Sequence, residues 1–232
     1  MAIAFDNTGS ATANFPVTAL TVDITAASTG AFCYCYIQAS NNNPSGFTMA
    51  GWQQLCDINE GTNSHLGLYR RVKQSGDTTF TVTWTNTSSA TACWSSYTGL
   101  NATYPEEGFR SALHTAASAT YTTASVTPAS NDRWALCGVS AKSTVSAETW
   151  APPGTQTIRS QAVGTTTPWS PAAIADSNGP VTQAQHNYAF TLSASESHGG
   201  AAICFLIPAT SSTPAYPGPV VKDQGVQRAA TW

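Results

Sequence analysis

The chain has 232 residues and a formal net charge of −3 at pH 7, and only 9% of its residues are Asp, Glu, Lys or Arg, against roughly 25% in an average soluble protein. Hydrophobic content is an ordinary 41%, so Thr, Ser, Ala and Gly replace the missing charges. This composition excludes a coiled coil, a basic nucleic-acid-binding protein and an acidic disordered tail. The longest apolar run, residues 201–207, is far shorter than the roughly 20 residues of a membrane-spanning helix, so no membrane partner is expected.

The elements expected along the chain are β-strands. Residues 31–37 form a nearly continuous apolar run, typical of a strand covered on both faces. Residues 79–85 alternate hydroxyl and bulky apolar side chains, which predicts a half-buried strand with Phe80, Val82 and Trp84 pointing inward. Residues 201–207 repeat the first pattern. Turn clusters rich in Asn, Ser, Gly and Pro separate such runs, and no window carries a helical apolar stripe, so the fold class is all-β.

The six cysteines are expected to be buried thiols. The N-terminus lacks a basic region followed by an apolar stretch, so no secretory signal is expected and the chain is expected to be made in a reducing cytoplasm. Metal binding is not expected, because Cys33-Tyr34-Cys35 is not a CxxC motif and no second pair or nearby His completes a site. The cysteines are Cys33, Cys35, Cys56, Cys93, Cys137 and Cys204.

An internal repeat relates two parts of the chain. Residues 32–39 align with residues 134–141 at a separation of 102, and residues 80–83 align with residues 190–193 at a separation of 110. Between them, Phe47 aligns with Trp150 at a separation of 103. The order of these matches is preserved and their separation only grows, as expected if loops lengthened after a duplication. The pseudo-repeats cover about residues 18–100 and 121–208.

Each pseudo-repeat supplies four or five strands, which is enough for a sheet but scarcely for an independent domain. The two halves are therefore predicted to combine into one two-sheet, jelly-roll-type β-sandwich over residues 1–208, with two small tandem sandwiches as the alternative. Residues 209–232 contain several prolines and little apolar periodicity, so they are predicted to form an extended C-terminal arm. Either the arm is a disordered tail, or its Tyr216 and Trp232 dock on a neighbouring subunit.

Motifs of common active sites are missing from the sequence. It contains no GxSxG elbow, no phosphate loop, no GxGxxG fingerprint and no HExxH pair. The four histidines are isolated and the carboxylates are scattered, so catalytic, cofactor-binding and metal-binding residues are not assigned and the protein is expected not to be an enzyme. A glycosidase-type carboxylate pair brought together by the fold remains an alternative.

Two further groups of residues suggest contacts with partners. Trp52 and Trp169 lie beside turn residues and are candidate glycan contacts, although core packing is the ordinary role of a strand tryptophan. Arg70, Arg71 and Lys73 form the one basic cluster. On a strand Arg71 and Lys73 would share a face and Arg70 would point to the other, which favours edge charges or ion pairs with a partner over a phosphate site.

The residues of the repeat also resemble a β-sandwich family common in tailed-phage virion proteins. The resemblance rests on residues 51–55 (GWQQL), 66–72 (LGLYRRV), 80–84 (FTVTW) and 94–100 (WSSYTGL), which are similar to the family's PxGW turn, YRK/RV strand, Thr-rich strand and YxGV strand end. Residues 150–155 and 201–208 resemble a second copy, with the family's ALxP finish. The chain departs from the pattern at Ala50, where Pro or a small residue is common, and at Thr155, where the Trp is missing.

The resemblance implies a structural component of a bacteriophage particle, such as a capsid decoration or minor capsid protein. A minor tail protein or a carbohydrate-binding surface module for host attachment is the alternative. The expected location is the virion, and the expected partners are the major capsid protein or other virion proteins and further copies of the chain, for which a trimer is the working expectation. Residues 1–15, with Phe5 and Phe15, and residues 209–232 would act as terminal arms that cross-link neighbours.

Overall fold

The computed structural model describes residues 1–40, 44–59, 64–144, 147–194 and 199–210. Within these ranges the chain forms β-strands and no helix, and the strands make three antiparallel sheets. None of the described residues forms a helix that is long and apolar enough to cross a membrane. The all-β prediction is thus confirmed, but the structure has three sheets where the sequence predicted two. The proposed arm beyond Thr210, with Tyr216 and Trp232, lies outside the described residues.

The first sheet comes entirely from the first half of the chain (residues 1–98). Its strand order is β1-β6-β2-β5-β4, and β3 pairs with a further part of β6. The bounds are β1 (Ala4–Asp23), β2 (Phe32–Ser40), β3 (Ser45–Met49), β4 (Gln53–Asn59), β5 (Ser64–Val72) and β6 (Thr79–Thr98).

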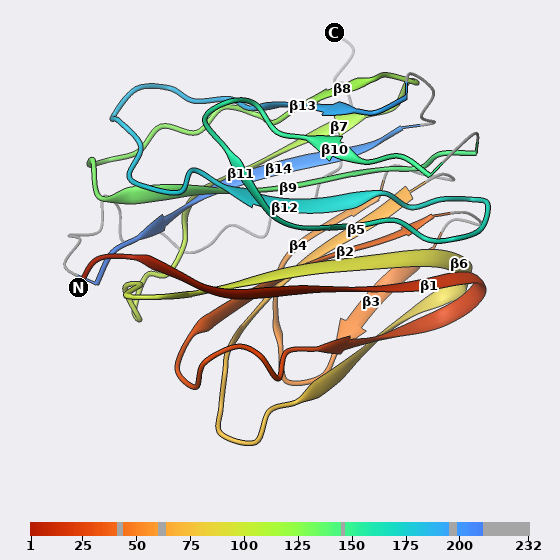
Figure 1. Ribbon diagram of the computed structural model, residues 1–232, viewed down its shortest axis with the longest axis horizontal. Helices are drawn as coiled ribbons and strands as arrows, with labels where there is room; N and C mark the ends of the chain where they lie inside the picture. Colours follow the sequence, from red (N-terminus) through yellow and green to blue (C-terminus); the bar gives the residue numbers. More distant parts are fainter. Residues whose placement is uncertain (41–43, 60–63, 145–146, 195–198, 211–232) are drawn as a thin grey trace, which may run out of the picture.

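The second half (residues 107–208) builds the other two sheets (Figure 1). The second sheet has the order β11-β12-β9-β14-β7, and the third has the order β10-β13-β8. Their bounds are β7 (Glu107–His114), β8 (Thr120–Thr122), β9 (Arg133–Ala141), β10 (Trp150–Ala151), β11 (Thr157–Ala162), β12 (Ala172–Asp176), β13 (Ala189–Leu192) and β14 (Gly200–Pro208).

The first sheet folds over itself because its two longest strands bend. The pairing of β1 with β6 shifts register between Ala13 and Val17 and again before Ala19, and such irregularities bend strands and increase their twist. One part of the β1–β6 pair lies in the five-stranded layer with β2, β5 and β4. The other part, together with β3, covers one face of that layer and encloses the first-half core, which includes Val22, Val82 and Trp84. Figure 1 shows both strands crossing the molecule before they turn.

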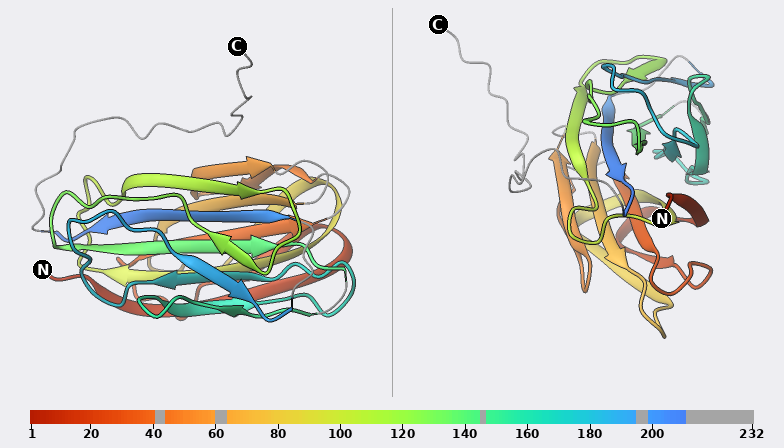
Figure 2. Two further views of the ribbon diagram at one scale, coloured as in Figure 1. Left: turned by 90° about the horizontal axis from the view of Figure 1, so that it is seen from above. Right: turned by 90° about the vertical axis from the view of Figure 1, so that its left-hand side faces the viewer.

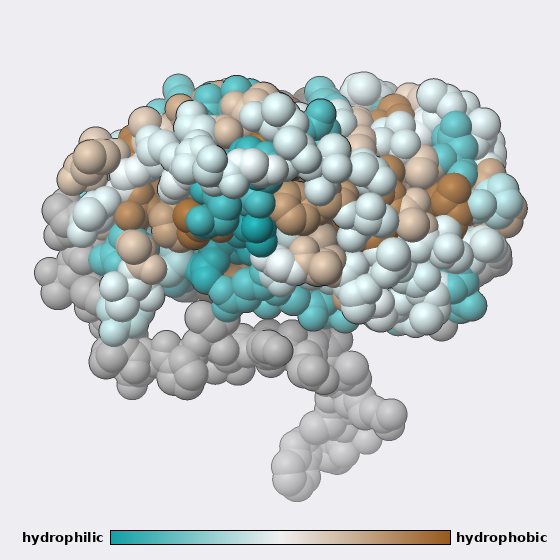
Figure 3. Space-filling model, turned by 90° about the horizontal axis from the view of Figure 1, so that it is seen from below, coloured by the Kyte–Doolittle hydropathy of each residue, from teal (hydrophilic) through white to brown (hydrophobic). Residues whose placement is uncertain are grey.

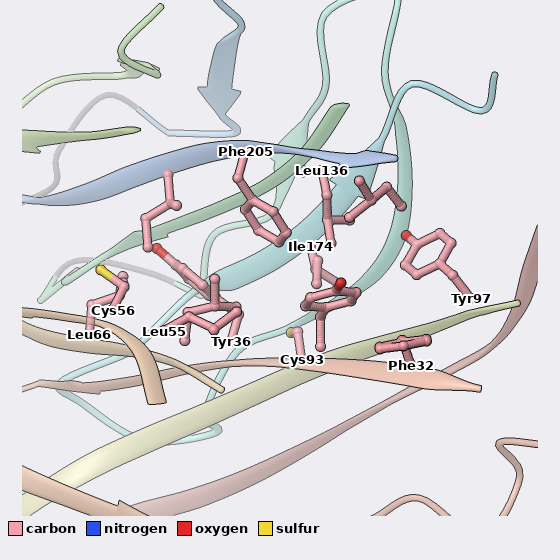
Figure 4. Packing of buried hydrophobic residues seen from close by; sticks show 14 of the residues in the cluster. Phe32, Tyr36, Leu55, Cys56, Leu66, Cys93, Tyr97, Leu136, Ile174 and Phe205 are labelled. Carbon is pink, nitrogen blue, oxygen red and sulfur yellow. The ribbon is translucent and has the colours of Figure 1, made fainter. Parts of the chain in front are cut away.

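The molecule consequently has four β-layers with three apolar clusters between them (Figure 2). The first-half core lies inside the folded first sheet, and the second-half core lies between the second and third sheets. The inter-half core lies between the five-stranded layers of the two halves, with Tyr36, Leu66 and Tyr97 facing Leu136, Ile174 and Phe205 (Figure 4). These central strands are buried on both faces, which explains their nearly continuous apolar sequences.

The strand registers of the two halves follow the offsets of the sequence repeat. Phe32 lies opposite Tyr97 in the first sheet, and the residues 102 and 110 positions later, Trp134 and Ile207, lie opposite each other in the second. The irregularity between Gln54 and Cys56 in the first sheet recurs between Ile158 and Ser160. The alignment of Phe47 with Trp150 is corrected by these registers. Trp150 lies opposite Leu192, and the corresponding position in the first half, opposite Val82, is occupied by Met49.

Candidate interaction surfaces

The outer layer of the first half presents a row of hydroxyl side chains, which we call the threonine face. Its centre is the alternating sequence of β6, in which Val82 and Trp84 point into the first-half core and the intervening threonines point to solvent. The register of β6 with β1 and β3 places more hydroxyl residues beside them. The threonine face consists of Thr21, Ser45, Thr48, Thr79, Thr81, Thr83 and Thr85.

Cross-strand hydrogen bonds tie these hydroxyl groups together. The side-chain oxygens of Thr48 and Thr83 lie 2.7 Å apart, and those of Ser45 and Thr85 are also 2.7 Å apart. The branched side chains are further restricted by their backbone. The result is a relatively rigid surface of methyl and hydroxyl groups, with exposed Asp23 opposite Thr79 at its margin. Away from Asp23 it can pack against a partner without the desolvation cost of a buried charge.

The opposite outer layer of the molecule has a similar surface. The outward residues of the third sheet are Thr120, Thr122, Ala151, Ala189 and Thr191, which lie side by side in the register of β8, β13 and β10. None of these five side chains is charged. Figure 3 views the molecule from the side of the first half, and on that side it shows mostly pale residues of intermediate hydropathy around a smaller hydrophilic patch.

The predicted interface residue Arg70 pairs within the chain. Its guanidinium donates from Nη1 to both carboxylate oxygens of Glu106, at 2.8 and 2.6 Å, and from Nη2 to Gln53. Burial raises the pKa of Glu106, while the charge of Arg70 opposes that shift. This pair fastens the segment between the halves to the end of β5.

Arg71 points to the other side of β5 and also pairs within the chain. It donates from Nε and Nη2 to the carboxylate of Asp77 at 2.7 and 2.8 Å, and these hydrogen bonds lower the pKa of Asp77 to about 2. Its guanidinium lies 4.6 Å from the centroid of the Phe80 ring, and Phe80 packs edge-to-face with Trp52 at 5.5 Å. Arg71 thus covers an aromatic pair in the first half, and both arginines have partners within the chain.

A third arginine holds the two halves together. Arg159 donates to the buried carboxylate of Asp176 at 2.7 and 2.9 Å, and its guanidinium lies 4.3 Å from the centroid of Phe5. The hydroxyl of Tyr97, which comes from the first half, donates to the same carboxylate at 2.7 Å. Asp176 also accepts the backbone N–H of Asn178 at 2.8 Å. Phe5 therefore contributes to an internal contact, with its ring half-buried.

The other predicted contact residues differ in accessibility. Trp52 is only 8% exposed and belongs to the first-half core, so little of its indole could stack on a sugar. Trp169 is half-buried, and its backbone pairs with Ser143. Phe15 is 39% exposed on β1. Phe15 and Trp169 therefore fit surface contacts better than Trp52 does, and their roles remain predictions.

Sequence reasoning missed the pairing that assembles these surfaces. The alternation of residues 79–85 identified outward threonines, but nothing in a single sequence indicates that Ser45 and Thr48 lie beside them. The hydrogen bond between Tyr97 and Asp176 joins residues 79 positions apart, and no local sequence pattern predicts it.

The described residues contain no group of three or more His, Cys, Asp or Glu side chains that could hold a metal ion. The chain matches no protein-family model, and comparisons with curated proteins and with solved structures give no match.

Proposed function

We propose that this protein is a structural component of a bacteriophage particle, and that it packs against other virion proteins through its weakly charged outer layers. The observation that carries the proposal is the threonine face, with its similar counterpart on the third sheet. Both surfaces belong to hydrogen-bonded sheets, so a partner would bind them with little loss of conformational entropy. A shell with many repeated subunits gains avidity from such modest contacts.

The fold proposed for each half is a jelly roll, and the two halves are proposed to derive from a duplication. When the bent β1 and β6 are each counted as two strands, the first half has eight strands. Their order is 1-8-3-6-5 in one layer and 2-7-4 in the other. This is the jelly-roll order, except that the fifth strand pairs with the sixth. The same strand order in the second half and the shared registers support a duplication. Each sheet takes its strands from one half only, which favours two tandem sandwiches over a single sandwich shared by both halves.

The assignment to a phage particle is supported by the family resemblance. The GWQQL segment spans the turn between β3 and β4 and the start of β4, and YRRV ends β5. The FTVTW segment lies in β6, where its threonines belong to the threonine face and its Val and Trp point into the first-half core. These segments shape the turns and the core of the first half. Within this proposal the protein decorates a capsid of major capsid protein, with a trimer as the working state and the terminal arms as cross-links.

The proposal is tested by measuring the copy number of the protein in purified particles by quantitative mass spectrometry. Hundreds of copies per particle would indicate the shell and a handful the tail, whereas absence from the particle would refute a virion role. Particles that lack the protein are then incubated with purified wild type or with the Thr81→Glu, Thr83→Glu double variant. We expect at least tenfold lower occupancy for the variant.

Ser75→Glu, in an exposed turn of the same half, is a control for negative charge added away from the threonine face; it adds one charge where the double variant adds two. Ser75→Glu should change stability by only about 0.5 kcal/mol, whereas Thr83→Glu also removes the hydrogen bond between Thr48 and Thr83. Equal melting temperatures of wild type and both variants would show that the fold is unaffected. If the double variant binds particles as well as wild type and Ser75→Glu do, the threonine face is not the contact surface.

The second candidate is a carbohydrate-binding surface module or minor tail protein, and the half-buried Trp169 favours it. Titration with host cell-wall glycans should then change tryptophan fluorescence, and Trp169→Ala should remove the change. A flat titration with the wild-type protein across a glycan panel would exclude this candidate.

A further inference from the structure

Two thiols face each other across the centre of the second sheet. Cys137 of β9 lies directly opposite Cys204 of β14, and the two sulfurs are 3.1 Å apart, with the Cys137 thiol donating to Cys204. Both residues are buried in the second-half core, with exposures of 1% and 0%. All six cysteines are free thiols in the structure.

The corresponding position of the first half is built differently. There Cys35 lies opposite Trp94, so a thiol faces an indole ring. The thiol of Cys93 in turn donates to the backbone oxygen of Ala172 at 3.3 Å. Cys35 is therefore a matched control for Cys137, since both are buried cysteines on the third-from-edge strand of a five-stranded layer.

We propose that Cys137 and Cys204 form a reversible disulfide that joins β9 to β14 when the chain meets an oxidising environment. Directly opposed residues on antiparallel strands have Cα atoms about 4.5 or 5.5 Å apart. A disulfide needs a Cα separation of about 4.4–6.8 Å, so the backbone already lies within the required range. The bond requires the two sulfurs to approach each other by about 1 Å, because their separation in a disulfide is about 2.05 Å.

The reaction is a thiol–disulfide exchange with a small disulfide such as oxidised glutathione. The thiolate of one cysteine attacks glutathione disulfide, forming a mixed disulfide and releasing one glutathione thiolate. The second cysteine, also as its thiolate, attacks the protein sulfur of that mixed disulfide and releases the second glutathione. The protein loses two protons and two electrons, and glutathione disulfide is reduced to two molecules of glutathione.

Burial sets when this bond can form. Desolvation raises the pKa of the Cys137 thiol well above its usual value, so the reactive thiolate is scarce in the folded protein. The disulfide therefore forms during folding, or slowly through openings of the sheet. Once formed, the same burial shields it from reductants. The chain would stay reduced in a cytoplasm and become cross-linked outside it, whether or not it belongs to a virion.

The bond would stabilise the second half through the unfolded state. It closes the segment between positions 137 and 204, which contains β10 to β13, and a closed segment of this length has far fewer unfolded conformations. We expect the melting temperature of the oxidised wild-type protein to exceed that of the reduced protein by roughly 5 °C or more.

The test uses the full chain, refolded either with oxidised and reduced glutathione or with a strong reductant. Free thiols are then alkylated under denaturing conditions, and peptides are identified by mass spectrometry without reduction. The expected result is a linked pair of peptides containing Cys137 and Cys204, two hydrogen masses lighter than the separate peptides. Alkylation of both cysteines after oxidative refolding would overturn the proposal, and this readout needs no variant.

Two variants show whether the shift in melting temperature comes from the Cys137–Cys204 disulfide. Cys204→Ala should abolish the difference between oxidised and reduced samples, whereas Cys35→Ala should retain it. A shift that persists in Cys204→Ala, or a linked wild-type protein with an unchanged melting temperature, would contradict the stabilising bond. Should Cys204→Ala fail to fold, Cys137→Ala serves the same purpose from the other strand.

Discussion

The two halves of the molecule reach the same strand order by different routes. In the first half, β1 and β6 are continuous strands of 20 residues that bend from one layer into the other. In the second half, the same paths are divided into β7 and β8, and into β13 and β14, with separate sheets as the result. The same order of strands within the layers is therefore reached with continuous or with divided strands. Each segment is held in its layer by its own apolar face.

The cores differ in the same way. The first-half core contains three tryptophans, Trp52, Trp84 and Trp94, whereas among the described residues the second-half core contains Trp150 and the directly opposed Cys137–Cys204 pair. At one place between the halves, a large side chain of the first half meets a glycine of the second. Tyr36 of β2 packs over Gly138, which occupies its own corresponding position in β9. The halves are thus complementary where they are not identical.

The largest effect is expected for the phenylalanines at corresponding positions of β13 and β6. Phe190 is completely buried, whereas Phe80 is half-buried beneath Arg71. We predict that Phe190→Ala lowers the free energy of unfolding by about 3–5 kcal/mol and that Phe80→Ala lowers it by about 1–2 kcal/mol, since less area is lost. Urea denaturation measures both, and equal losses would contradict the assigned difference in burial.

A slightly smaller effect is expected where the halves interlock. A Cβ atom at Gly138 would collide with the Tyr36 ring, and overpacking of a buried contact costs about 1–3 kcal/mol. We predict a loss near the upper end for Gly138→Ala. In a double-mutant cycle with Tyr36→Leu, the two losses should be strongly non-additive. Additive losses would mean that Tyr36 and Gly138 do not contact each other in solution.

The hydrogen bond from Tyr97 to Asp176 tests the contact between halves more gently. Its acceptor is a buried carboxylate, so Tyr97→Phe should cost about 1.5–3 kcal/mol, whereas Tyr36→Phe, which removes long bonds to the Ser140 hydroxyl and the backbone oxygen of Ala201, should cost about 1 kcal/mol. Thermal denaturation at neutral pH compares the two variants. A larger loss for Tyr36→Phe would reverse the predicted order.

The smallest effect belongs to the ion pair at the outer end of the first half. Because its pKa is lowered to about 2 in the folded protein, ionised Asp77 contributes stability above the usual aspartate pKa of about 3.9, and this contribution disappears as the pH falls towards 2. Asp77→Asn should cost about 1 kcal/mol at pH 7, because the asparagine side chain still accepts a hydrogen bond from Arg71 although the charge is lost. The melting temperatures of wild type and Asp77→Asn should approach each other as the pH is lowered from 7 to 2. A difference in melting temperature that stays constant over this range would argue against the ion pair.

Local alternation allowed much of the fold to be predicted. Residues 79–85 indicated that Val82 and Trp84 face inward, and both are buried. The same reasoning put Arg71 and Lys73 on one face, and both contact Asp77. The third sheet could not be predicted, because it depends on the pairing of β13 with β10 and β8, which are segments far apart in the sequence. The partner of Arg70, Glu106, is 36 residues away, so its identity depends equally on the tertiary fold.

Several chain segments meet beside Gly99 at one end of the molecule. Ala2 lies against Gly99, where a Cβ atom would collide with the Ala2 backbone oxygen, and Gly99 also has a positive φ of 75°. The N–H of Thr210 donates to the Gly99 oxygen at 2.8 Å. The segment between the halves starts there as well. The protein is therefore suited to circular permutation, since a short peptide could join residue 210 to the N-terminus while new ends are opened in the exposed turn at Ser75–Gly76. Such a permutant would keep all three sheets.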